Sequence, residues 1–141
     1  MDSDLIRRIE NIRLLALDVD GVLTDGGVYV FEDGTEFRRF NIKDGHGLKR
    51  LIEAGIKVAI ISSASTKSVV HRAKKLGIEE VHLGVKDKLE ILTDLCTRFK
   101  IKFDQVAYMG DDLLDLPVMK KVGLPCAPSD ACDEILEQAQ I

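Results

Sequence analysis

A short apolar run, Leu14–Leu17, stops abruptly at Asp18 and Asp20, and this feature most constrains what the chain can fold into. Four consecutive apolar residues before a polar break are typical of a strand that is buried on both faces, as in a parallel sheet. Both carboxylates then lie at the carboxyl end of the strand, which is where open α/β sheets bind their ligands. We therefore expect a parallel sheet with acidic side chains at its functional edge.

The length and composition indicate one globular domain over residues 1–141. With 45% hydrophobic and 31% charged residues, the chain is neither disordered nor membrane-like in composition, and it is long enough to bury a core. No apolar run approaches the roughly 20 residues that span a bilayer. The acidic start, residues 1–4, does not resemble a signal peptide. We expect a cytoplasmic protein with no membrane partner.

Charge and cysteine content exclude further classes. The net charge is −4 and the basic residues are scattered, so the sequence gives no electrostatic footprint for nucleic acid. The three cysteines are odd in number and lack a Cys-x-x-Cys spacing, which argues against a disulfide framework or a zinc site. We expect Cys96, Cys126 and Cys132 to be buried thiols.

A β-hairpin is predicted over residues 27–40. The segments 27–32 and 35–40 are rich in β-forming residues and flank an Asp-Gly pair, which is the strongest short hairpin signal. Alternation places Tyr29 and Phe31 on one face of the ribbon and valines on the other, so both faces are apolar. Because a two-stranded ribbon cannot bury both faces alone, we expect the hairpin to leave the domain body and pack against other subunits.

The rest of the chain alternates strands and helices, which is typical of βαβ units and predicts a three-layer α/β/α Rossmann-like fold. Further strands are expected at 57–61, 81–83, 106–109 and 123–127. The expected helices are a short entry helix at 4–11, one from its cap Asp44 to about 54, one ending at Gly77, one at 86–99, one after Asp112 and a terminal one capped by Ser129.

Polar residues follow several of these strands and meet at one edge of the predicted sheet. They are Asp18, Asp20, Ser62, Lys86 or Lys88, Asp111 and Asp112. Crowded carboxylates repel one another unless a cation lies between them, and ligands that are all oxygen favour Mg²⁺. A hydroxyl and an ammonium beside the metal are suited to the oxygens of a phosphoryl group. One aspartate can then attack phosphorus while the other moves protons.

These residues resemble the four ordered motifs of the haloacid dehalogenase-like phosphohydrolases. The motifs are the run Leu-Asp-Val-Asp-Gly-Val-Leu-Thr-Asp at 17–25, Ser62 after an apolar strand, Lys88, and Gly-Asp-Asp-Leu-Leu-Asp at 110–115. The resemblance implies that Asp18 is the nucleophile and a Mg²⁺ ligand. Asp20 is implied as the acid/base and gives its backbone carbonyl to the metal.

The remaining roles are also implied by the resemblance. Ser62 and Lys88 hold the phosphate, and it is the resemblance alone that favours Lys88 over Lys86. Asp111 completes the metal site, while Asp112 and Asp115 lie beside it, Asp112 as the better candidate for a water-mediated ligand. Separately, Lys43 is a candidate to meet a carboxylate of the substrate.

The absence of a cap domain before Ser62 and the segments 43–48 and 115–119 resemble a small capless branch, which contains the 3-deoxy-D-manno-octulosonate 8-phosphate phosphatases of lipopolysaccharide synthesis. This implies hydrolysis of that sugar acid phosphate by homotetramers that join through their hairpins. Two departures concern the substrate: Ala64 stands where the branch usually has arginine, and the sequence given ends at Ile141, before a glycine-rich tail.

Three alternatives stay open at this point. One is a phosphatase of nine-carbon sugar acid 9-phosphates. The others are a receiver-like domain that accepts a phosphoryl group, and a non-catalytic tetramerising module.

Overall fold

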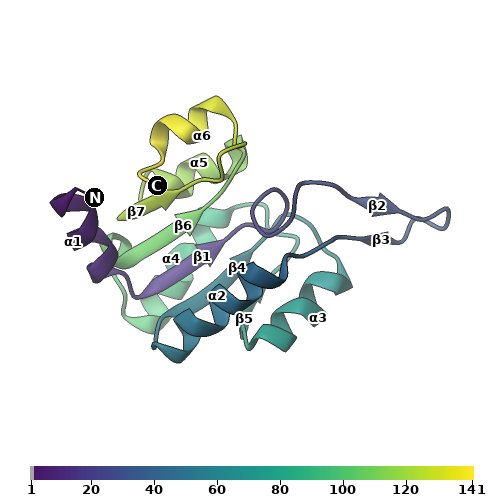
Figure 1. Ribbon diagram of the computed structural model, residues 1–141, viewed down its shortest axis with the longest axis horizontal. Coiled ribbons are helices and arrows are strands. Elements are labelled where there is room, and N and C mark those ends of the chain that lie inside the picture. The colour runs from purple at the N-terminus through teal and green to yellow at the C-terminus, as the bar shows by residue number, and fades with distance from the viewer. Residues whose placement is uncertain (1) are drawn as a thin grey trace.

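The computed structural model, which describes residues 2–141, contains a five-stranded parallel sheet (Figure 1). Its strand order is β5-β4-β1-β6-β7, with β1 in the centre. The strands are β1 (Leu14–Leu17), β4 (Lys57–Ile61), β5 (Glu80–His82), β6 (Val106–Met109) and β7 (Leu124–Cys126). The expected α/β fold is confirmed, and the strands lie within one residue of their expected bounds.

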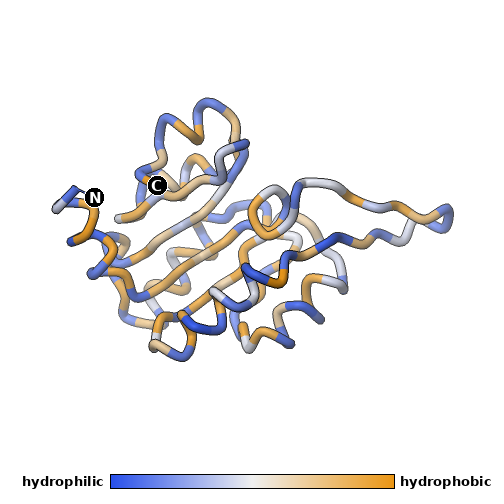
Figure 2. Tube along the Cα trace, in the orientation of Figure 1, coloured by the Kyte–Doolittle hydropathy of each residue, from blue (hydrophilic) through white to orange (hydrophobic). Residues whose placement is uncertain are grey.

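Helices cover both faces of the sheet. On one face lie α1 (Ser3–Asn11), α2 (Ile42–Glu53) and α3 (Lys67–Leu76), and on the other α4 (Lys88–Phe99), α5 (Leu116–Met119) and α6 (Asp133–Gln138). Alternate residues of β1 enter different cores: Leu14 and Ala16 pack towards α4, whereas Leu17 packs towards α2 and α3. Figure 2 shows these central strands as the apolar middle of the molecule.

Several helix starts differ from their expected positions. Helix α2 begins at Ile42, because the side chain of Asn41 accepts a hydrogen bond from Lys43 N and caps the helix before Asp44 can. Helix α4 begins at Lys88 because Asp87 is its cap. The terminal helix starts after Cys132, so the expected cap at Ser129 is wrong. Between β6 and α5, a short 3₁₀ turn (Leu113–Asp115) replaces part of the expected helix.

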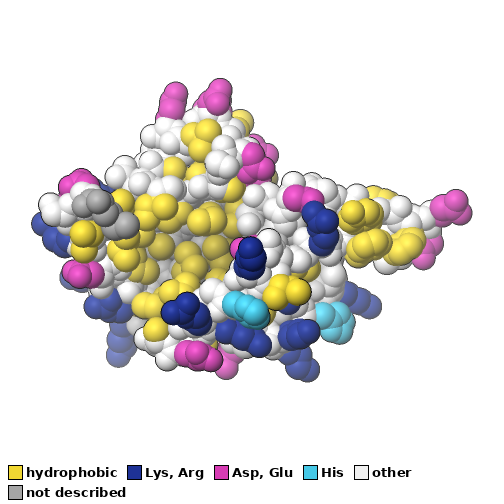
Figure 3. Space-filling model, in the orientation of Figure 1, with side chains coloured by type: hydrophobic (Ala, Val, Ile, Leu, Met, Phe, Trp, Pro, Cys, Tyr) yellow, Lys and Arg dark blue, Asp and Glu magenta, His cyan; other side chains and the backbone are white. Residues whose placement is uncertain are grey.

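The hairpin projects from the body as an arm (Figure 1). Its ladder is shorter than expected, with β2 (Tyr29–Val30) paired to β3 (Glu36–Phe37). The rings of Tyr29 and Phe37 stack with centroids 4.8 Å apart, and Phe31 lies 5.2 Å from Phe37. Val30 is 63% exposed on the opposite side. Apolar side chains therefore cover an arm that the body does not bury (Figure 3).

The three cysteines are free thiols. Cys96 and Cys126 are buried as expected, whereas the expectation of a buried thiol is wrong for Cys132, which is only half-buried. Within residues 2–141, no helix has the length and apolar character needed to cross a membrane.

Candidate active site

Asp18 lies at the carboxyl end of β1 and is 8% exposed. Its backbone N–H donates to the carbonyl of Met109 on β6 at 3.1 Å, which fixes the position of the residue between two strands. Its Oδ1 accepts from the backbone N–H of Val19 at 2.8 Å and pairs with Lys88 Nζ at 3.1 Å. Burial raises the pKa of Asp18, and the ammonium of Lys88 opposes that rise. The carboxylate is held rigidly in one orientation beside one cation.

Lys88 is held from below by Asp115. Nζ donates to Asp115 Oδ1 at 2.8 Å, and the same oxygen accepts from the hydroxyl of Tyr108 at 2.5 Å. The second oxygen, Oδ2, accepts from the backbone N–H groups of Asp111 at 3.1 Å and Asp112 at 3.3 Å. Asp115 and Tyr108 are fully buried. Burial, together with the carboxylate of Asp115, raises the pKa of Tyr108 well above its usual value, so its hydroxyl stays a donor.

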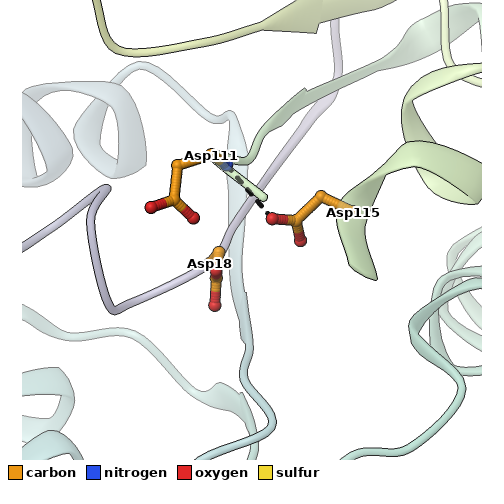
Figure 4. A group of neighbouring side chains, drawn as sticks. All are labelled: Asp18, Asp111 and Asp115. Atoms are coloured by element: carbon orange, nitrogen blue, oxygen red, sulfur yellow. Dashed lines mark hydrogen bonds between the residues drawn. The ribbon is translucent and has the colours of Figure 1, made fainter. Parts of the chain in front are cut away.

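Three carboxylates converge at this point (Figure 4). Asp18, Asp111 and Asp115 each offer one oxygen, and these oxygens lie within 4.8 Å of one another. Burial and the neighbouring carboxylates, Asp18 foremost, raise the pKa of Asp111 to about 6. One ammonium does not balance three carboxylates, and oxygen donors of this kind fit Mg²⁺. The residues present therefore suit the expected metal.

Gly21 makes room for this cluster. Its φ is +82°, a backbone conformation that glycine adopts readily. A Cβ atom at this position would lie 1.7 Å from Asp111 Oδ2, so any side chain would displace the carboxylate. The glycine in the acidic run is therefore required both by the turn and by the position of the Asp111 carboxylate.

Asp20 has different surroundings from Asp18. Its side chain is 36% exposed, and it pairs with the guanidinium of Arg38, through Nε at 2.5 Å and Nη2 at 3.2 Å. Arg38 directly follows β3 of the exposed hairpin, yet its own side chain is buried. The sequence did not identify Arg38, because nothing local shows that the hairpin folds back onto the turn after β1.

Ser62 follows β4, the strand next to β1, and is 1% exposed. Leu17 pairs with Ile60, so Ile61 lies opposite Asp18. Ser62 is the next residue after Ile61 and lies at the same edge of the sheet. Its Oγ accepts from the backbone N–H of Ala64 at 3.2 Å, which leaves the hydroxyl proton available to a ligand. The phosphate-binding role of Ser62 stays a prediction.

The other candidates lie further out. Lys43 is exposed, makes no side-chain hydrogen bond or ion pair within residues 2–141, and borders two surface grooves of about 610 and 640 Å³. Neither groove is lined by Asp18 or Ser62. Asp112 is exposed and accepts from the backbone N–H of Leu113 at 2.7 Å. Their roles at the substrate and the metal stay predictions.

Tyr108 was also missed, although the sequence held a signal for it. It lies within a strand that is expected to be buried, and a buried tyrosine hydroxyl needs a hydrogen-bond partner. The acidic run immediately after that strand offers one, and Asp115 takes the role.

Comparison with known proteins identifies similar proteins that are hydrolases. A family model described as "Hydrolase: haloacid dehalogenase-like hydrolase" matches residues 44–123. The chain is 44% identical over 139 residues to the 3-deoxy-D-manno-octulosonate 8-phosphate phosphatase KdsC of Escherichia coli K12, an alignment that covers 99% of this chain and 74% of that protein.

Solved structures agree. The 3-deoxy-D-manno-octulosonate 8-phosphate phosphatase from Yersinia pestis superposes with a TM-score of 0.97 at 44% identity, covering 99% of this chain and 76% of that one. The phosphatase of the same name from Moraxella catarrhalis, solved in complex with a magnesium ion, a phosphate ion and KDO, gives a TM-score of 0.96 at 35% identity, covering 99% and 80%. The chain therefore belongs to the haloacid dehalogenase-like hydrolases, in the family of the 3-deoxy-D-manno-octulosonate 8-phosphate phosphatases.

Proposed function

We propose that this chain is a Mg²⁺-dependent phosphatase that hydrolyses 3-deoxy-D-manno-octulosonate 8-phosphate to the free sugar acid and phosphate. The observation that carries the proposal is the buried Asp18 carboxylate, paired with Lys88 at 3.1 Å and facing Asp111 at the edge of the sheet. The similarity supports the same conclusion, because this chain is 44% identical to a 3-deoxy-D-manno-octulosonate 8-phosphate phosphatase.

The first half-reaction breaks the bond between phosphorus and the sugar oxygen. An oxygen of Asp18 attacks phosphorus and forms an aspartyl-phosphate, while Asp20 gives its proton to the departing sugar oxygen. Lys88 and Ser62 hold the phosphoryl oxygens, and Lys88 balances the charge of Asp18 in the resting site. When bound, Mg²⁺ supplies positive charge for the phosphoryl oxygens.

The second half-reaction restores the enzyme. Asp20, now a carboxylate, takes a proton from a water molecule whose oxygen attacks phosphorus. The bond between phosphorus and Asp18 breaks, phosphate leaves, and both aspartates return to their initial states. Two acids with different surroundings at one strand end suit this division of labour, because Asp18 is buried beside Lys88 whereas Asp20 is partly exposed.

The decisive experiment measures release of phosphate from 3-deoxy-D-manno-octulosonate 8-phosphate with and without Mg²⁺. We expect turnover that requires the metal and that falls by about 10⁴-fold or more in Asp18→Asn, since the nucleophile is lost. Asp94→Asn, an exposed carboxylate on α4, is the matched control and should keep full activity. A normal rate in Asp18→Asn would overturn the proposal.

Metal binding has its own readout in the free protein. Mg²⁺ should raise the melting temperature, because a ligand of the native state stabilises it by about 2.7 kcal/mol at a concentration of 100 Kd. Asp111→Asn should weaken this response. A stable phospho-Asp18 with negligible hydrolysis would instead favour the receiver-like alternative.

Substrate choice is tested against a nine-carbon sugar acid 9-phosphate, because Ala64 stands where the family usually has arginine. We expect higher kcat/KM for the eight-carbon substrate. Equal and slow turnover of both would count against a dedicated role in either reaction.

The assembly belongs to the proposal as well. We infer a homotetramer joined through the hairpin, supported by the exposed side chains of Tyr29, Val30 and Phe31 on an arm that the body leaves uncovered. A cytoplasmic location and the absence of nucleic-acid partners stay predictions.

A further inference from the structure

Arg38 connects three segments of the chain at the edge of the active site. Its guanidinium pairs with Asp20 through Nε at 2.5 Å and Nη2 at 3.2 Å. The third nitrogen, Nη1, lies 3.3 Å from Thr66 Oγ1 at the start of α3 and 3.6 Å from Glu36 Oε2 on β3. The side chain is 4% exposed. A cation that belongs to the projecting hairpin is thus buried against the proposed acid/base.

The neighbouring arginine shows that this burial is specific. Arg39 has a side chain that is 74% exposed and makes one ion pair, with Asp25 at 3.2 Å. An exposed pair of this kind contributes little to stability, whereas a buried guanidinium is strongly unfavourable without its partners. Arg38 meets that requirement by engaging both oxygens of Asp20 with the planar fork that only arginine has.

The two contacts fix the orientation of the Asp20 carboxyl group. One planar guanidinium donates from Nε to Oδ1 and from Nη2 to Oδ2, which leaves the carboxyl group little freedom to rotate. The side chain of Asp20 is nevertheless 36% exposed, so the group that Arg38 orients is open to solvent and substrate. Arg38 therefore sets the direction in which Asp20 faces.

We propose that Arg38 is a positioning residue for proton transfer, through which the hairpin aims the carboxyl group of Asp20 at the leaving oxygen of the substrate. The inference rests on the proposed function, and adds to it a residue whose side chain contacts Asp20, Thr66 and Glu36. It also gives the arm a catalytic role beyond any role in assembly.

The test uses leaving groups of different basicity. A sugar alkoxide is a poor leaving group and needs the proton of Asp20, whereas p-nitrophenolate departs without one. The ratio kcat/KM reports the step in which the leaving group departs, before the hydrolysis that both substrates share. We therefore compare kcat/KM for 3-deoxy-D-manno-octulosonate 8-phosphate and for p-nitrophenyl phosphate in wild-type and variant enzyme.

Arg38→Met should lower kcat/KM for the sugar phosphate by about 10²-fold, the scale of general acid catalysis, and change that for p-nitrophenyl phosphate little. Arg38→Lys, which keeps the charge and loses the fork, should show the same selectivity with a smaller loss. Arg39→Met, one residue along the same arm, should match the wild type on both substrates. A merely structural role of Arg38 would lower both rates equally.

Two outcomes overturn the inference: an equal loss on both substrates, or no loss on either. If Arg38→Met lacks the circular dichroism of the folded protein, Arg38→Lys carries the comparison, and absence of selectivity in that variant overturns the inference too. Failure of the proposed function is distinct, because the wild-type enzyme would then release no phosphate from the sugar acid phosphate.

Discussion

Asp18 and Asp20 are separated by one residue, yet two different regions of the molecule hold them. Asp18 is supported by the interior, through Lys88, Asp115 and the buried hydroxyl of Tyr108. Asp20 is supported by the arm, through Arg38. The first carboxylate is fixed by groups that fold with the sheet, whereas the second depends on where the hairpin lies.

The difference fits the two different roles that we propose for these identical side chains. A nucleophile must stay in place, and a buried network of ion pairs and hydrogen bonds holds Asp18 in position. An acid/base must exchange protons with water and substrate, which the greater exposure of Asp20 allows. Substitutions that alter the interior network around Asp18 or the arm that holds Asp20, but not both, test the two regions separately.

The largest effect is expected at Lys88. Lys88→Met leaves the carboxylates of Asp18 and Asp115 buried without a cation, which should reduce the free energy of unfolding by about 3–5 kcal/mol and abolish turnover. Lys86→Met, an exposed lysine two residues earlier, should leave both unchanged. Urea unfolding measures the difference.

A double variant shows whether the cause is the uncompensated charge. Lys88→Met combined with Asp115→Asn removes one of the stranded carboxylates and should recover part of the stability. If the losses of stability in Lys88→Met and Asp115→Asn simply add up in the double variant, the two side chains are not energetically coupled, and the proposed network is contradicted.

The next effect concerns the innermost member of the same network. Tyr108→Phe removes the donor to Asp115 and should destabilise the protein by about 1.5–3 kcal/mol, the usual range for a hydrogen bond to a charged group. Tyr29→Phe, an exposed tyrosine in the arm, should change stability negligibly. Equal denaturation midpoints for Tyr108→Phe and Tyr29→Phe would show that the buried hydroxyl of Tyr108 does not stabilise the protein.

A smaller effect on subunit stability is expected in the arm. Replacing Val30 and Phe31 by serine should alter the free energy of unfolding of a subunit by about 0.5 kcal/mol or less, because both side chains are exposed. If the proposed tetramer forms through the arm, the same change should shift sedimentation towards smaller species. Val70→Ser, an exposed apolar residue on α3, is the control. An unchanged tetramer in the hairpin variant would contradict assembly through the arm.

The sequence predicted the interior support better than the arm. The apolar run before Asp18 and the polar residues after neighbouring strands were sufficient to locate the acidic edge, because parallel strands end at one side of a sheet. For Lys88 against Lys86, the sequence pattern alone left the choice open. In the structure Lys88 is buried beside Asp18 at the start of α4 whereas Lys86 is exposed, which supports Lys88 as the lysine of the site.

The contact between Arg38 and Asp20 was not predictable in the same way. It joins residues 18 positions apart through an arm whose direction no local pattern specifies. The expected six-residue strands of the hairpin were too long for a related reason. Arg38 is buried against Asp20, and Phe40 packs on the core beneath α2. Residues 38–40 therefore contact the domain body and do not pair with β2.

The smallest effect belongs to an ion pair outside both regions. Hydrogen bonds from Arg98 hold the pKa of Glu80 below its usual value, against the opposing effect of burial. A lowered pKa in the folded state stabilises the protein above the ordinary pKa of the group, and this contribution is lost as pH falls through the lowered value. Arg98→Gln should therefore lower the urea midpoint slightly at pH 7, with a difference that closes under acid, while activity is unchanged. A difference that persists once Glu80 is protonated would assign the effect to packing of Arg98 on Phe99, whose ring centroid lies 5.2 Å from the guanidinium carbon.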